Sequence, residues 1–410
     1  MSGKDTVTAN SRLPPLDLTT IGQQVQQTGA YSALEWLLES GLVPYPAYEQ
    51  WRHGGIRCLE DAVQADSADW IGRLREGEAH ARALGLVQDT HTYYDWRPGH
   101  GDRPLALSPD AVRGKLLAQR WVRPADLRQF DLFLDSGAGG VEHDLHGALA
   151  ARNADAAERI CARLCRMAPS HPGLGDYEAL VLYARHLERL PVIPSGTALE
   201  EMEGLEQEIA PLARERLRGQ ARDYLAPAWR RLAEALSRNR FDPVHPDRHA
   251  SYAQMQIPDW EAVTRSVLAV RDHAEHVVLL SRLALALHHR QAPEAAMLAW
   301  ARCCETAPET PPADLVPEAA QRLYRRVLEF EALDEVLDPV HFSAWLLLRE
   351  PGLLHHLDRL DTPVPAGVAF LAMAELLRTR ARGADELAAR RHLQQISPAL
   401  LRAYLNRERT

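Results

Sequence analysis

The sequence predicts an all-α protein, in which stacked antiparallel helix pairs form an α-solenoid-like array after a smaller helical N-terminal region. Three observations lead to this fold class. Apolar residues recur at helical spacing in the N-terminal part, and two distant segments share one helix–turn–helix pattern. Glycine or proline stands at the breaks between the helical segments, where helices are expected to stop.

The composition is that of a globular protein. Of the 410 residues, 46% are hydrophobic and 25% are charged, which is enough apolar surface for a large core. No apolar stretch reaches the roughly 18–20 residues of a membrane span, and the first residues lack the basic-then-apolar pattern of a secretory signal. We therefore expect a cytoplasmic protein that does not span a membrane.

The charged residues argue against a general nucleic-acid surface. The net charge is −9, whereas binding to phosphates requires clustered positive charge. Lysine occurs only at Lys4 and Lys115, and every other cation is arginine. This bias indicates a GC-rich bacterial genome. The alternative is an arginine-rich RNA-binding protein, which the interspersed acidic residues disfavour.

The N-terminal region, residues 18–105, follows a polar segment at 1–17 that is expected to be a disordered tail. Glycines and helical spacing predict three helices in this region, over residues 21–41, 45–55 and 58–86. The first is expected to bury a stripe formed by Tyr31, Leu34, Leu37 and Leu38, with Trp36 beside it. Residues 87–109 have no helical period and are predicted to be a linker, in which 91–96 is compatible with a short strand. A further helix is expected over 109–121.

Two segments with a shared pattern, Leu145–Pro172 and Leu283–Pro311, lie in the array expected over residues 106–410. Each has an Ala-rich helix, a short polar turn, a second helix and a terminal Ala-Pro that stops it. With Pro293 taken as a one-residue insertion, the matching positions are Ala148-Leu149 with Ala286-Leu287, Arg152 with Arg290, Ala156-Ala157 with Ala295-Ala296, and Cys165 with Cys304. Further breaks are expected at 190–204 and 239–249.

This helix pair resembles the tetratricopeptide repeat, which carries small residues where its two helices meet and a proline at its end. The copies lie roughly four 34-residue units apart, and the resemblance covers about residues 141–400. The family's Trp, Leu, Gly and Tyr positions are absent from both copies. The resemblance implies a scaffold or adaptor that binds a peptide or a partner protein in a groove of helical repeats. An irregular all-α domain is the alternative.

The polar positions on the first helix of each pair are the expected binding residues. They form a basic, histidine-rich set that would suit an acidic peptide or a C-terminal carboxylate: His143, His146, Arg152, Arg282, His289 and Arg290. Trp96 and Arg97 in the linker are a further expected anchor, with Trp96 exposed. The alternative for the basic set is that these side chains are solvated and pair with neighbouring acids.

An enzyme is the competing class. Its site would lie at the glycine loop Gly137–Gly140 before a helix start, or at the polar cluster of His245, Asp247, Arg248 and His249. The loop lacks the known phosphate-binding spacings, and a rigid turn between helices, with Asp247 capping the next helix, is the favoured explanation of the polar cluster. No histidine cluster supplies the three or four ligands that a metal needs, so neither a metal nor a cofactor is expected. The five cysteines are expected to be free core residues.

Overall fold

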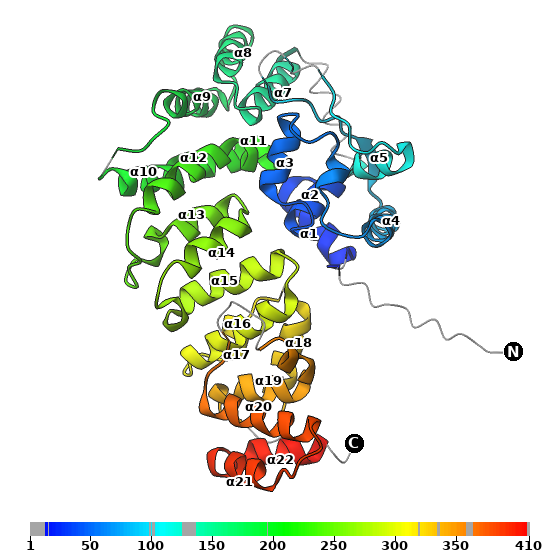
Figure 1. The fold of residues 1–410 in the computed structure, drawn as a ribbon. Coiled ribbons are helices and arrows are strands. Elements are labelled where there is room, and N and C mark those ends of the chain that lie inside the picture. The colour runs from blue at the N-terminus through cyan, green and yellow to red at the C-terminus, as the bar shows by residue number, and fades with distance from the viewer. Residues whose placement is uncertain are drawn as a thin grey trace, which may run out of the picture. The chain divides into compact units, whose positions relative to one another are not determined.

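The computed structural model describes residues 13–14, 16–97, 100, 103–124, 137–194, 196–318, 320–333, 337–357 and 364–407. Residue contacts divide the chain into two compact units, Met1–Leu236 with Gln256–Asp259, and Ser237–Met255 with Trp260–Thr410. Both consist mainly of helices that pack against their neighbours in the chain (Figure 1). The only sheet in the described residues has three short strands. The all-α prediction is therefore confirmed.

Polar caps and glycines set the ends of many helices in the first unit. Asp17 accepts a hydrogen bond of 2.9 Å from the Thr20 amide at the start of the first helix, and Gly29 ends that helix with φ of 82°. Asn153 caps a later helix by accepting from the Ala156 amide at 3.0 Å. The helices are α1 (Leu18–Thr28), α2 (Ala33–Glu39), α3 (Tyr45–Arg52), α4 (Ser67–Ala83), α5 (Ala111–Leu117), α7 (Gly137–Ala150), α8 (Ala154–Met167), α9 (Leu174–Arg189), α10 (Ala198–Gly204), α11 (Ala210–Leu217) and α12 (Ala221–Leu236).

The small antiparallel sheet of the first unit corrects two predictions. Its strands are β1 (Ala30–Ser32), β2 (Val87–Thr90) and β3 (Gln119–Val122), in the order β1–β3–β2. The expected helix over 21–41 is wrong, because the left-handed Gly29 ends α1 and a strand precedes α2. The expected helix over 109–121 ends at Leu117 and is followed by β3. Tyr31 is fully buried, as expected, but it lies on a strand. Tyr94 forms an isolated bridge with Pro104 within the predicted linker.

The start of the first unit and residues around position 105 pack into one body. Leu16 is only 2% exposed, and its carbonyl lies 2.9 Å from His80 Nδ1. The segment expected to be a tail is thus buried at Leu16, while residues 1–12 and 15 lie outside the described residues. The Trp51 indole donates to the Ala106 carbonyl at 2.9 Å, across the boundary expected at residue 105. The division into units falls after Leu236 instead.

Gly77 has no side chain, which allows α4 to pack closely against Leu16 and Tyr31. A Cβ atom at this position would lie 2.5 Å from the Leu16 side chain and 2.6 Å from the Tyr31 hydroxyl. A Cβ atom there would force one of these side chains to shift, which favours glycine although it weakens a helix interior by about 1 kcal/mol relative to alanine.

The second unit has one continuous apolar core. The core includes Trp300, Phe342, Trp345 and Phe370, together with buried leucines from successive helices. The helices are α13 (Ala250–Gln256, its last residue counted with the first unit), α14 (Trp260–Leu268), α15 (Val277–His289), α16 (Pro293–Thr306), α17 (Pro312–Leu315), α18 (Gln321–Glu331), α19 (Phe342–Arg349), α20 (Val368–Ala381), α21 (Leu387–Ile396) and α22 (Pro398–Arg407).

The two similar sequence segments form two similar helical hairpins, α7–α8 and α15–α16. Helices α8 and α16 both have 14 residues and follow a three-residue turn. In one turn the Ala148 carbonyl accepts from the Asn153 amide at 3.0 Å, and in the other the Leu287 carbonyl accepts from the Ala292 amide at 3.0 Å.

This hydrogen-bond pattern corrects the sequence alignment by one residue. Leu287 corresponds to Ala148 and not to Leu149. Gln291, not Arg290, therefore corresponds to Arg152. Pro293 begins α16 as Ala154 begins α8, so no insertion is needed. Proline is well suited to this first helical position, where the amide has no partner within the helix.

No helix in the described residues is both long enough and apolar enough to cross a membrane.

Candidate functional site

Of the expected anchor, Trp96 is buried in the first unit and Arg97 is partly exposed beside it. Trp96 is 5% exposed, so the prediction that it is exposed is wrong. The guanidinium carbons of Arg52 and Arg152 lie 4.3 and 4.9 Å from the centre of its ring. Cation–π attraction of this kind stabilises buried tryptophan between arginines. Arg97 forms an ion pair of 2.5 Å with Asp95, which holds the pKa of that carboxyl at about 2.

Arg152 belongs to an internal network of charges and not to an open basic surface. It shares Glu49 with Arg230, each through an ion pair, and its Nε donates to the Asp223 carbonyl at 3.1 Å. The Asp223 carboxylate accepts from the hydroxyls of two tyrosines of α3, Tyr45 and Tyr48, each at 2.9 Å. These bonds join α3, the α7–α8 turn and α12.

Of the two histidines on α7, His146 is bonded to Tyr177 within the first unit, and His143 is exposed. The Tyr177 hydroxyl donates to Glu142, so it accepts from His146 Nε2, which lies 2.7 Å away. Burial lowers the pKa of His146 to about 4. His146 is therefore a neutral hydrogen-bond donor at neutral pH.

The polar cluster of residues 245–249 and Arg282 come together in the second unit. Arg282 is 6% exposed and donates to the Pro246 carbonyl at 2.8 Å and to Asp247 at 2.5 Å. His249 is buried 2.9 Å from the Ser251 hydroxyl. His245 pairs with Asp242 at 2.9 Å, and Arg248 is exposed. These contacts fasten the loop to α15 and α13, in agreement with a rigid turn between helices.

His289 and Arg290, at the end of α15, contact α14. The His289 ring stacks on Trp260 with a centroid distance of 4.3 Å and an interplanar angle of 6°. Arg290 is exposed and donates to the Thr264 hydroxyl at 3.3 Å. The expected basic set is thus divided between the two units, and its members with the most contacts, Arg152 and Arg282, are paired with carboxylates.

The expected glycine loop at Gly137–Gly140 is the first turn of α7 and not a loop. Its residues carry helical backbone, so the prediction of a loop at these residues is wrong. All five cysteines are free, and Cys58, Cys161, Cys303 and Cys304 are buried. Within the described residues, no group of three or more His, Cys, Asp or Glu side chains converges as metal ligands would.

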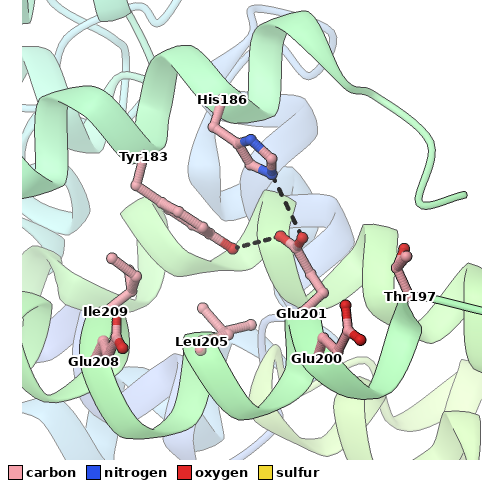
Figure 2. A pocket seen from close by; sticks show the side chains of 9 residues that line it. Tyr183, His186, Thr197, Glu200, Glu201, Leu205, Glu208 and Ile209 are labelled. Carbon is pink, nitrogen blue, oxygen red and sulfur yellow. Dashed lines mark hydrogen bonds and ion pairs between the residues drawn. The ribbon is translucent and has the colours of Figure 1, made fainter.

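The candidate site is a pair of hollows beside α9 in the first unit. The first hollow has a volume of about 330 Å³, at the lower end of the roughly 300–1,000 Å³ of small-molecule sites. Tyr183 and His186 project into it from α9, opposite side chains of α10 and of the π-helical turn η2 (Leu205–Ile209) (Figure 2). Its lining is Tyr183, His186, Thr197, Glu200, Glu201, Gly204, Leu205, Glu208 and Ile209.

Glu201 holds the two sides of this hollow together. Its carboxylate accepts from the Tyr183 hydroxyl at 3.3 Å and lies 3.4 Å from His186 Nε2 (Figure 2). Arg231 of α12, only 6% exposed, forms an ion pair with the same carboxylate and donates to the Leu190 carbonyl. Burial raises the pKa of Tyr183 above its usual value, so this hydroxyl remains a donor. The rings of Tyr183 and His186 stack at 5.8 Å.

Two other carboxylates of the hollow, Glu200 and Glu208, are exposed and have no ion-pair or hydrogen-bond partner among the described residues. They lie on one helical face with Gly204 between them, and a Cβ atom at Gly204 would meet nothing within 4 Å. The amide of Ala210 bonds to the Leu205 carbonyl in the π-helical turn just before Pro211. Such turns inside helices are frequent at functional sites.

The second hollow shares His186 with the first and has a volume of about 680 Å³. Its lining is Glu158, Leu182, Arg185, His186, Arg189 and Leu190. Leu182 is 70% exposed and Leu190 is 44% exposed, which places two large apolar side chains at the surface. The guanidinium of Arg185 is neutralised by Asp155, Glu158 and Glu188.

Sequence reasoning missed these hollows because it treated residues 190–204 as a break. The structure confirms a break before Thr197, but Ala198–Gly204 is helical. The available signal was the spacing of Glu200, Gly204 and Glu208, which places two acids and a glycine on one helical face. That pattern gives no sign of the partner helix α9, which supplies Tyr183 and His186.

Comparison with known proteins gives no relative: no protein-family model, no curated protein and no solved structure matches the chain.

Proposed function

We propose that the protein is a helical-repeat scaffold, similar in design to tetratricopeptide-repeat proteins, that binds a peptide segment of a partner protein. The binding surface is the pair of hollows beside α9. The observation that carries the proposal is that two hollows sharing the lining residue His186 combine exposed Leu182 and Leu190 with the unpaired carboxylates of Glu200 and Glu208. Peptide sites commonly combine apolar anchors with a few oriented polar groups.

The rigid setting of the site supports binding. Arg231 is buried and joins α12 to both Glu201 of α10 and the Leu190 carbonyl at the end of α9, so α9 and α10 are both tied to α12. A preorganised surface loses little side-chain and loop entropy when a ligand binds. By contrast, Arg152 and Arg282, two of the residues first expected to bind a partner, are used for internal ion pairs.

A selection from a random peptide library tests this function. We expect the purified full chain to enrich peptides with dissociation constants below about 100 µM, or about −5.5 kcal/mol. A Leu182→Glu, Leu190→Glu double variant should lose this binding without losing its fold, because both side chains are exposed. The matched control is Val112→Glu, which changes a 61% exposed apolar residue on α5. Absence of any enriched peptide would contradict the proposed function.

A further inference from the structure

We propose that the first hollow receives a cationic side chain of the partner peptide, arginine before lysine, while a neighbouring large apolar side chain covers Leu182 and Leu190. This inference rests on the proposed function and names the chemistry of its ligand. Three properties of the hollow support it: its negative charge, the open space at its centre and the two aromatic rings in its wall.

The charge balance is negative. Three carboxylates line the first hollow, and the cation behind them, Arg231, is already paired with one of them, Glu201. His186 lies against the same carboxylate. Glu200 and Glu208 therefore keep their charges uncompensated, since nothing in the described part of the chain pairs with them. A cation placed between two carboxylates gains charge-assisted hydrogen bonds, whereas an anion would be repelled.

The shape leaves a space where the cation would lie. In Figure 2, Glu200 and Thr197 lie toward one end of the hollow, Glu208 and Ile209 toward the other, and Leu205 between them. Gly204 occupies the helical position between the two free glutamates, and the space above it is open. An alanine or a larger residue would be the better helix former here. The missing side chain thus opens the centre of the hollow.

The lining favours a planar cation. Tyr183 and His186 stack with an interplanar angle of 25° and form one wall. A guanidinium can lie on an aromatic face and still donate in its own plane to carboxylates, which an ammonium group does less well. Arginine is therefore expected to bind more tightly than lysine.

The second hollow determines what should flank the cation. The two hollows meet at His186, so a residue next to the cation reaches Leu182 and Leu190. Both leucines are exposed and would be covered by a large apolar side chain. Arg189, an exposed cation of the second hollow, disfavours a second positive residue at that side.

Four peptide pools test the inference on the full chain. Each pool displays random 12-residue peptides in which the sixth position is fixed as Arg, Lys, Gln or Glu. We expect the Arg pool to be enriched about tenfold over the Gln pool, the change that about 1.4 kcal/mol produces. The Lys pool should lie between them, and the Glu pool should be depleted.

Two variants locate the effect. Gly204→Leu should abolish the preference for cations and leave the melting temperature unchanged or higher, because it fills the open space and improves the helix. The double variant Glu200→Gln, Glu208→Gln should make the Arg and Gln pools equal. The matched control Asp69→Asn, Glu76→Gln removes two exposed acids from α4 and should keep the preference.

The outcomes separate the two proposals. Equal enrichment of all four pools, or a preference for cations that survives in Gly204→Leu, overturns the inference and leaves the proposed function standing. If no pool is enriched on the folded wild-type chain, the proposed function fails and the inference fails with it.

Discussion

Arg152 and Gln291 occupy the same position in two helical hairpins, and both have a left-handed backbone, with φ of 59° and 58°. At each residue the amide bonds to the carbonyl three residues earlier, Leu149 or His288. This is the position after a helix end that glycine prefers. Gly383 fills the equivalent position after α20, with φ of 65° and the same hydrogen bonds. The backbone turn is repeated, although the side chain at its centre differs in each copy.

This relationship predicts opposite effects of one substitution. Gln291→Gly should raise the free energy of unfolding by about 1 kcal/mol, because glycine adopts the left-handed conformation without strain. Arg152→Gly should lower it by several kcal/mol, because the change leaves Glu49 with one cation fewer in a largely buried network. Chemical denaturation of both variants measures the effects. Gly383→Ala serves as the control and should be destabilising. If Gln291→Gly and Arg152→Gly changed the free energy of unfolding equally and in the same direction, this explanation of the turns would be wrong.

Leu149 and Leu287 are both buried, at 1% and 5% exposure, although they are not at equivalent positions. Leu149→Glu and Leu287→Glu should each lower the stability by several kcal/mol, since each places an unpaired carboxylate in an apolar core. Thermal melting measures the loss. Leu182→Glu, at an exposed position of α9, is the control and should have little effect. A melting temperature that stays at the wild-type value in either core variant would show that its hairpin does not pack as described.

Glu305 of α16 holds the start of α20 through its nearly buried carboxylate. It accepts from the amides of Ala366 at 2.8 Å and Gly367 at 3.0 Å, and from the Ser343 hydroxyl at 2.6 Å. Glu305→Gln should destabilise the second unit by about 2 kcal/mol, because an amide nitrogen replaces one acceptor and faces these donors. Hydrogen exchange should become faster at the first turn of α20. Glu309→Gln, an exposed change just after α16, should leave exchange unaffected. Unchanged exchange in Glu305→Gln would show that the Glu305 carboxylate does not hold the start of α20.

His146 predicts a loss of stability in acid. Burial lowers its pKa from 6.5 to about 4 in the folded state, so the unfolded state takes up the proton first. The free energy of unfolding should fall as the pH drops from about 6.5 toward 4, by up to about 2 kcal/mol from this residue at pH 5.

Chemical denaturation at several pH values across this range should show that the free energy of unfolding falls less steeply with decreasing pH in His146→Gln than in the wild type. His143→Gln, at the exposed histidine of the same helix, should keep the wild-type slope. If the slope of His146→Gln equals that of the wild type, His146 is not neutral in the folded protein.

The fold class could be predicted from the sequence because helical periodicity and helix stops are local signals. Pro293 and Asn153 at helix starts and Gly29 at a helix end are such signals. The sheet could not be predicted, because its strands have only three or four residues and lie far apart in the chain. Tyr31 fitted a helical stripe by spacing, but its pairing with Trp121 depends on tertiary contacts.

The candidate site was less predictable for a related reason. Arginines and histidines on helix surfaces suggested a basic groove, yet Arg152 finds its partner, Glu49, about a hundred positions away in the sequence. Such pairing is a property of the packed chain. The free carboxylates of Glu200 and Glu208 likewise depend on the packed chain, because the cation behind the hollow, Arg231, pairs with Glu201 instead.

The central claim, that a partner peptide binds beside α9, is tested most directly by hydrogen–deuterium exchange of the full chain with and without an enriched arginine-containing peptide. Binding at this site predicts slower exchange in fragments that cover residues 182–190 and 198–209, and weaker protection of the same fragments in the Gly204→Leu variant at the same peptide concentration. Protection confined to other segments, such as the α15–α16 hairpin, would contradict it.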